Sequence, residues 1–410
     1  MYSLNLTKER KVLLTLIANS LSTEKEIQID VETLKTVDFS AVLDEALAQA
    51  VHVLTFSSLK KYEEYVPKEV YEKWKTLFLK SCRKNLIVGN NQAEMVNVLS
   101  TNNLDYVILK GEASASYYPN PELRALGDVD FYVGYDNASK TEEALISAGY
   151  IRDDMKHKSH MIFKKSPAHL EMHYNIAGVP LGKKGEIVKE RIKDILIKTQ
   201  KKSGLMGEFL APSDFHHGIV ILLHTQHHNL NDGLGLRHLC DWASFVNKTV
   251  NMPFWTEMVE FMREISIIKY ASVLTKLCAT YFDTALPDWA KDAEDELCSA
   301  LLEDVFLGGN FGRKDNKRAR SGLLITKNGE KKRGAIRTLA VELHRSILIR
   351  YPIVKKVWIL YPFIYGYKVI KNFIQMLFGK KVSIGKMKPQ AKLRQELYDK
   401  LQVFNETEDD

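Results

Sequence analysis

Cysteine is scarce in this 410-residue chain, and its four cysteines lie far apart with no Cys-x-x-Cys pair. The spacing excludes a disulfide framework and cysteine-based zinc sites, and it predicts reduced, mostly buried thiols. Long apolar runs are missing too. The best candidate, residues 357–367, is far shorter than the roughly 18–20 residues of a membrane-spanning helix and contains Pro362. Charged residues at 8–11 interrupt the first apolar stretch, so no signal peptide is expected. We therefore expect a soluble, cytoplasmic protein.

Acidic residues are nearly missing from one part of the chain. Residues 313–388 hold twenty Lys and Arg but only Asp315, Glu330 and Glu342, whereas the whole chain has a formal net charge of +7. This basic stretch, interleaved with aromatic residues, predicts contact with an anionic partner such as a nucleotide, a nucleic acid or a lipid headgroup surface. The last of these would place the protein at the periphery of a membrane. The alternative is a solvated basic face whose aromatic residues pack onto the protein itself.

Helical periodicity covers most of the sequence, and one β-rich stretch interrupts it. Apolar spacing predicts helices within 6–21, 38–59 and 67–99 and again from Pro212 onward, with Asp38 or Ser40 capping the second. Short apolar runs at 104–110 and 127–133 predict strands, and 160–165 and 169–176 predict a hairpin that turns at Pro167. The expected class is α+β. We expect a helical region 1–103, a small mixed-sheet domain 104–180, a helical domain 181–307 and a basic helical lobe 308–410.

Three carboxylates in the β-rich stretch indicate chemistry. Asp128 and Asp130 are two apart on a predicted strand, so their side chains share a face while Val129 and Phe131 point into the core. Glu171 lies on a later strand, on the face that it shares with His169 and His173. Carboxylates held close together repel one another unless a cation lies between them, and Mg²⁺ prefers such oxygen ligands. An exposed acidic pair without a metal is the common alternative. The apolar strand around this pair favours a metal site.

A second feature, before the aspartates, is suited to phosphate. Gly111 ends the predicted strand 104–110, where a glycine lets the backbone approach a phosphate closely and a following helix start offers free N–H groups. Lys110 and Arg124 add positive charge on either side. Together with the carboxylates, this predicts a triphosphate site opposite a metal site. Arg124 has an alternative partner in Glu122 or a carboxylate of the sheet.

These segments resemble a known superfamily. LKG at 109–111, YYPNPELRALGDVDFYV at 117–133 and HLEMHYNI at 169–176 are similar to nucleotidyltransferases with the DNA polymerase β-type palm, and in particular to a bacterial group of uncharacterised nucleotidyltransferases. The resemblance implies a palm between helical regions, with Asp128, Asp130 and Glu171 as catalytic metal ligands and Gly111 in the phosphate-binding turn. It also implies one or two Mg²⁺ ions and a nucleoside triphosphate, ATP among them, as substrate. Glu112 occupies a position that is usually Ser or Gly.

A histidine-rich segment follows the palm. His224 and His228 are four residues apart and therefore share a helix face, with His227 beside them. Packing in the core is the expected role, and a place in the substrate pocket or at a metal ion is the alternative. Arg237 and Asp241 have the same spacing and predict an ion pair within one helix.

Three functions agree with these features. The first is a Mg²⁺-dependent nucleotidyltransferase that moves a nucleoside monophosphate onto a hydroxyl or phosphate of a small molecule, glycan, RNA or protein. The second is a nucleotide-binding regulatory module without efficient transfer, which the unusual Glu112 favours. The third is an adaptor that binds nucleic acid or a membrane surface through the basic lobe.

Overall fold

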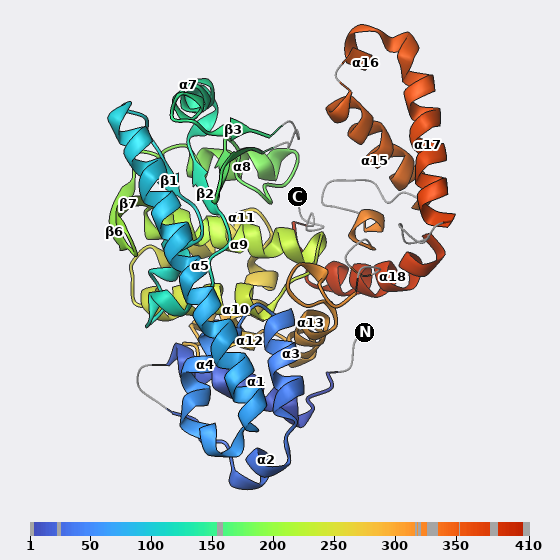
Figure 1. Cartoon of the computed structure of the whole chain (residues 1–410). Helices are drawn as coiled ribbons and strands as arrows, with labels where there is room; N and C mark the ends of the chain where they lie inside the picture. Colours follow the sequence, from blue (N-terminus) through green and yellow to red (C-terminus); the bar gives the residue numbers. More distant parts are fainter. Residues whose placement is uncertain are drawn as a thin grey trace.

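The computed structural model of the chain describes residues 4–22, 26–153, 159–315, 318, 321–325, 335–351, 353–377 and 384–404. Within these residues the protein is α+β, as expected, with a five-stranded mixed sheet set among helices (Figure 1). Three of the four cysteines are buried, as predicted, and Cys82 is half-buried; all four are free.

Helices form the part of the chain that precedes the sheet: α1 (Lys8–Leu21), α2 (Val31–Thr36), α3 (Phe39–Ala48), α4 (His52–Leu59), the 3₁₀ helix η1 (Lys60–Tyr65) and α5 (Lys68–Thr101). Asp38 caps α3 as predicted, because its carboxylate accepts hydrogen bonds from the backbone N–H groups of Ser40 and Ala41. The single helix predicted over 38–59 is wrong. The chain breaks between α3 and α4, where Ala50 has a φ of 57°. Gln49 at this break is fully buried and bonds to the backbone of Leu236 and Val305, so distant contacts override local helix propensity.

The sheet has the strand order β1-β2-β5-β4-β3, with β2 and β5 parallel and the other pairs antiparallel. The part of the chain that forms the sheet contains β1 (Val107–Ile108), α6 (Glu112–Ala115), the 3₁₀ helix η2 (Pro121–Leu123), β2 (Val129–Tyr132), α7 (Gly134–Ser147), β3 (Ile151–Arg152), β4 (His160–Lys165) and β5 (Ala168–His173). The predicted hairpin of β4 and β5 is confirmed, and it turns at Pro167. The predicted strands at 104–110 and 127–133 are also present, each shorter than expected.

The two faces of the sheet differ in chemistry because side chains alternate along each strand. Val129 and Phe131 of β2 and Leu170 and Met172 of β5 are buried in an apolar core. The helices α5 and α7 cover this face, and they contribute Val88, Met95, Leu99, Ala138 and Leu145 to the same core. The opposite face is therefore left to the polar residues that alternate with these.

The chain after the sheet is mainly helical and contains α8 (Lys183–Ile192), β6 (Thr199–Gly204), β7 (Gly207–Pro212), α9 (Asp214–Leu230), α10 (Leu236–Thr249), α11 (Trp255–Glu264), α12 (Ile268–Phe282), η3 (Asp288–Ala290), α13 (Asp295–Gly308) and η4 (Asn310–Gly312). Ser213 caps α9, because its side chain accepts a hydrogen bond from the backbone N–H of His216. A large core joins α9 to α13 with the N-terminal helices α1, α3 and α4. The sequence analysis missed the hairpin of β6 and β7, whose strands have little apolar alternation.

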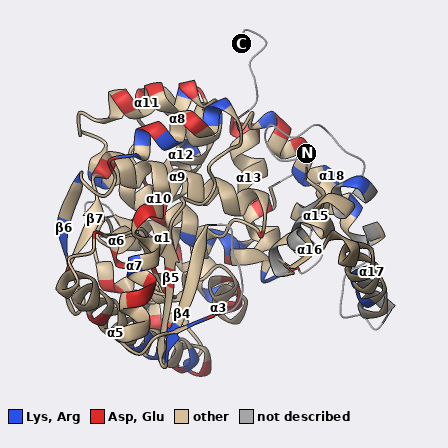
Figure 2. Cartoon of the chain, turned by 90° about the horizontal axis from the view of Figure 1, so that it is seen from above, with Lys and Arg blue, Asp and Glu red and all other residues tan. Residues whose placement is uncertain are grey.

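The C-terminal elements are η5 (Gly322–Leu324), α15 (Ala335–Arg350), α16 (Ile353–Lys356), η6 (Trp358–Leu360), α17 (Tyr361–Leu377) and α18 (Ile384–Lys400). The helix α18 packs against α13, whereas α15, α16 and α17 pack on one another and extend away from the sheet (Figure 1). Lys and Arg are spread over α17 and α18 (Figure 2). No helix among the described residues is long and apolar enough to cross a membrane.

Candidate active site

The three carboxylates predicted from the sequence lie on the polar face of the sheet. Asp130 of β2 and Glu171 of β5 are direct partners in the parallel ladder, so their side chains lie side by side on one face. Asp128, just before β2, lies two residues from Asp130 and therefore faces the same way. Asp130 is almost completely buried, whereas the side chain of Asp128 is 40% exposed. We call this polar face the acidic face because it holds Asp128, Asp130 and Glu171, and it is open to solvent at Asp128.

Lys110 and His173 hold Asp130. Its Oδ1 lies 2.6 Å from Nζ of Lys110 and 3.0 Å from Nε2 of His173. Burial of the carboxylate acts to raise its pKa, but the charge of Lys110 and the bond to His173 keep the pKa of Asp130 well below its usual range. Burial of Lys110 acts to lower its own pKa, yet the charges of Asp130 and Asp128 raise it overall. Both members of this pair are therefore charged at neutral pH.

Repulsion acts on Asp128. Its pKa is raised by burial and by the negative charges of Asp130 and Glu171, with Lys110 only partly compensating. A divalent cation between Asp128 and Glu171 would relieve that repulsion, and their oxygens are close enough to share one ion, so these two residues fit the expected Mg²⁺. Asp130 is held by Lys110 and His173 and is in none of the groups that could share an ion among the described residues.

Histidines extend the acidic face. Asp128, His169 and Glu171 each offer a ligand atom within 4.8 Å of the other two. His160 of β4 and His173 of β5 are direct ladder partners, and they form a second such group with Glu171. Glu171 thus belongs to both groups. The face has nitrogen as well as oxygen atoms that can bind a metal ion.

The turn after β1 has the backbone that the sequence analysis predicts. Gly111 has φ 61° and ψ −119°, a conformation that favours glycine, and α6 starts directly after it. The side chain of Glu112 turns toward α5 and the β6–β7 turn. Its carboxylate accepts hydrogen bonds from Nε2 of Gln92 at 2.7 Å and from the backbone N–H of Leu205 at 3.1 Å. Burial raises the pKa of Glu112, and a side chain at Gly204 would collide with its Oε2. Glu112 is therefore part of the packing between helix α5 and the hairpin.

Arg124 makes a buried ion pair with a partner that the sequence analysis did not expect. Its Nε and Nη2 each donate to one carboxylate oxygen of Asp241 on α10 at 2.7 Å, and Tyr118 donates to the same carboxylate. Burial acts to raise the pKa of Asp241, but Arg124 lowers it to about 2. Asp241 thus pairs with Arg124. Among the described residues it makes no ion pair with Arg237, so the predicted pair within one helix is wrong. The remaining nitrogen of Arg124, Nη1, is buried and makes no hydrogen bond there.

The comparisons with known proteins identify the family. The model of an uncharacterised nucleotidyltransferase family matches residues 35–283, well over half of the chain. The protein belongs to this family. No curated protein and no solved structure matches the chain. Family membership supports a transferase that acts on nucleotidyl groups, and the matched residues contain the whole acidic face, the Gly111 turn and both members of the Arg124–Asp241 pair.

Some residues of this site were not singled out from the sequence. His160 was not predicted, although it alternates with Met161 on a predicted strand and so follows the same rule as Glu171. Tyr118 was not predicted either. Asp241 was predicted to pair with Arg237 and not with Arg124, because 117 residues separate Arg124 from Asp241 along the chain.

Proposed function

We propose that this member of the family is a Mg²⁺-dependent nucleotidyltransferase that moves a nucleoside monophosphate from a nucleoside triphosphate to a hydroxyl or phosphate acceptor. The observation that carries the proposal is the pairing of Asp130 with Glu171 on adjacent strands, with Asp128 on the same face. In the proposed reaction the acceptor oxygen forms a bond to the α-phosphorus while the bond to pyrophosphate breaks. The proton of a hydroxyl acceptor passes to solvent.

Each residue has a part in this proposal. Asp128, Asp130 and Glu171 would hold Mg²⁺, which when bound neutralises charge on the transferred phosphoryl group. The backbone at Gly111 gives the triphosphate close access to the chain. Lys110 lies at the junction of that turn and the acidic face, where its ammonium group can contact both Asp130 and a phosphate. Arg124 can add only its Nη1, since its other two nitrogens bind Asp241.

The contacts of Glu112 support an enzyme over a regulatory module. The unusual residue is bonded to Gln92 and Leu205, and it adds no negative charge to the polar face of the sheet. The test is to incubate the protein with an acceptor-containing cell extract and a triphosphate labelled at either the α- or the γ-phosphate. Nucleotidyl transfer puts the α-label on the acceptor and the γ-label in pyrophosphate. A product labelled only from the γ-phosphate would show phosphoryl transfer and contradict the proposal.

We also propose that the helices α15 to α17 bring the protein to an anionic lipid surface. Trp358 and Phe363 are 78% and 74% exposed. Aliphatic residues are exposed beside them, namely Ile353, Val357, Ile359, Leu360, Val369, Ile370 and Ile374. Between Glu342 and Glu396 the sequence has no acidic residue and many Lys and Arg. Aliphatic side chains do not stack on bases, so this combination favours a bilayer interface over a nucleic acid.

A further inference from the structure

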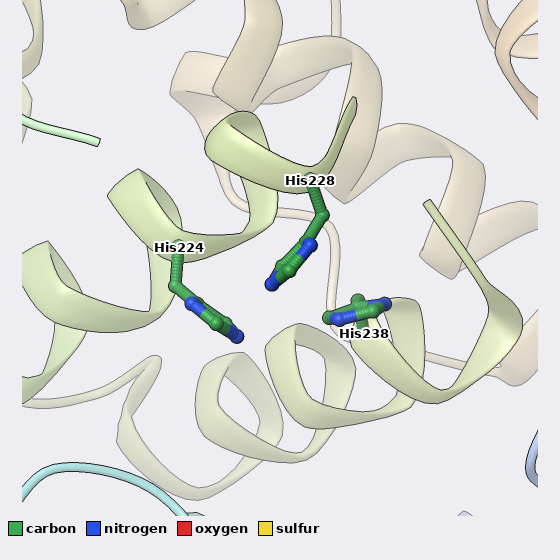
Figure 3. Close-up of side chains that lie close together, drawn as sticks. All are labelled: His224, His228 and His238. Carbon is green, nitrogen blue, oxygen red and sulfur yellow. The ribbon is translucent and has the colours of Figure 1, made fainter. Parts of the chain in front are cut away.

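Three imidazoles lie together outside the acidic face. His224 and His228 are one turn apart on α9, and His238 is in the first turn of α10 (Figure 3). Their ring centroids are 4.4 Å apart for His224 and His228, 4.9 Å for His228 and His238, and 5.8 Å for His224 and His238. Each ring offers a nitrogen within 4.8 Å of the nitrogens of the other two. The sequence analysis noticed the first two histidines but not His238.

The surroundings of the three rings suit metal ligands. Burial, with Lys110 and the neighbouring imidazoles adding to it, lowers the pKa of His224 well below its usual range. The pKa values of His228 and His238 are also lowered, and burial is the largest cause for both. The rings are therefore neutral at neutral pH, which is the form that binds a metal ion. Nδ1 of His228 is buried and makes no hydrogen bond among the described residues, and the carboxylate of Asp232 lies 3.6 Å away.

We propose that His224, His228 and His238 form a binding site for a transition-metal ion such as Zn²⁺. The donor set has nitrogen only, and imidazole suits Zn²⁺, Cu²⁺, Fe²⁺ and Ni²⁺, whereas Mg²⁺ prefers oxygen. Three protein ligands leave a coordination position for water or a substrate group, as in zinc enzymes with three histidines. Phe311 lies against two of the rings, with centroids 4.7 Å from His228 and 5.4 Å from His238. Its ring shields one side of the cluster from water.

Metal binding requires a small rearrangement. Zn²⁺ binds imidazole nitrogens at about 2.0–2.1 Å. The three ligand nitrogens lie within 4.8 Å of one another, so small movements of the rings are enough to bring them onto one ion. Nδ1 of His238 accepts a hydrogen bond from the backbone N–H of Gly235 at 3.2 Å. The ring of His238 must turn to place a lone pair toward the ion, which costs that one bond. Such a loss is small beside the free energy of zinc coordination.

The proposed site adjoins the acidic face. The charge of Lys110 acts on both His224 and His228, and the charge of Asp130 acts on His228. The two sites nevertheless share no ligand, because the first uses nitrogens of α9 and α10 and the second uses groups of the sheet. Since this inference does not depend on nucleotidyl transfer, each of the two can fail without the other.

The test is a titration of the purified, chelator-treated full chain with Co²⁺, whose visible absorption becomes much stronger when the ion leaves water for a four-coordinate site. We expect one equivalent of Co²⁺ to give a visible band that Zn²⁺ abolishes by competition. His224→Gln and His238→Gln should each weaken Co²⁺ binding at least tenfold, and Asp128→Asn should leave it unchanged. Far-ultraviolet circular dichroism and thermal melting of each variant show that it is folded.

Two results would overturn the proposal. One is the absence of a visible band from the wild-type protein. The other is a band that survives in folded His224→Gln and His238→Gln but disappears in Asp128→Asn or His169→Gln, which would assign the ion to the acidic face. If either glutamine variant does not fold, counting the imidazoles around Co²⁺ in the wild-type protein by X-ray absorption decides the question. Fewer than three would contradict the site.

Discussion

Asp130 and Glu171 are direct partners on the parallel strands β2 and β5, so two carboxylates emerge side by side from the middle of the sheet. Lys110 and His173 lie against Asp130 and keep its pKa low, whereas the pKa of the neighbouring Asp128 stays raised by partial burial and repulsion. The polar face is therefore a place where a cation is favoured and where Lys110 already supplies one positive charge.

Replacing Lys110 by Met should make metal binding tighter. The ammonium group lies 2.6 Å from Asp130, and its loss leaves three carboxylates with less compensation. We expect stronger binding of Mn²⁺ by calorimetry. We also expect a free energy of unfolding that is lower by about 1–3 kcal/mol in chelator and recovers in Mg²⁺. Lys198→Met, at an exposed lysine, is the matched control. Equal Mn²⁺ affinity in Lys110→Met and wild type would show that Lys110 does not compete for the site.

The Arg124–Asp241 pair should matter more for folding than a surface ion pair does. Because both groups are buried, Arg124→Ala leaves a carboxylate without its partner, and we expect a loss of about 3–5 kcal/mol in the free energy of unfolding. Arg124→Lys cannot reproduce the two parallel bonds and should recover only part of the loss. Denaturant titration measures both variants. A loss below about 1 kcal/mol in Arg124→Ala would put the pair in the class of exposed ion pairs.

Protonated His173 should stabilise the folded protein. Burial acts to lower its pKa, but its contacts with Asp130 and Glu171 raise it above the usual value of about 6.5. A histidine whose pKa is raised in the folded protein stabilises the fold fully below its usual pKa of about 6.5. This stabilisation is lost as the pH rises through the pKa of the folded state. The stability difference between wild type and His173→Gln should therefore shrink as the pH rises. Thermal melts of both proteins at pH values below and above about 6.5 measure this stability difference. A difference that grows with pH would contradict the assignment.

The exposed aromatic residues of the C-terminal helices should support membrane binding. Sedimentation with vesicles should retain the wild-type protein on phosphatidylserine-containing lipid and release it from neutral lipid or at high salt. Trp358→Ser with Phe363→Ser should weaken the binding several-fold. Ile151→Ser with Ile197→Ser, at equally exposed apolar positions elsewhere, should not. Binding to RNA but to neither kind of vesicle would favour the nucleic-acid alternative.

Local rules account for the parts that the sequence predicts well. The alternation of side chains along β2 and β5 depends only on neighbouring residues, so the shared face of Asp128 and Asp130, and that of His169, Glu171 and His173, could each be predicted without a structure. The pairing of Asp130 with Glu171 needs the register of two strands that are distant in sequence, and only the structure gives it.

Contacts between distant segments explain what was missed. The third histidine of the cluster lies across the turn from α9 to α10, and no helical spacing connects it to His224. The break at Ala50 depends on hydrogen bonds from Gln49 to residues about 190 and 260 positions away. Neither could be read from a local pattern.

The most direct test of the central claim is transfer of the α-label by matched variants of the acidic face. We predict that Asp130→Asn and Glu171→Gln lower transfer at least about a hundredfold while remaining folded. Glu143→Gln, at an exposed acid on α7, should keep the wild-type rate. Wild-type rates in folded Asp130→Asn and Glu171→Gln would contradict the account and place the reaction elsewhere on the protein.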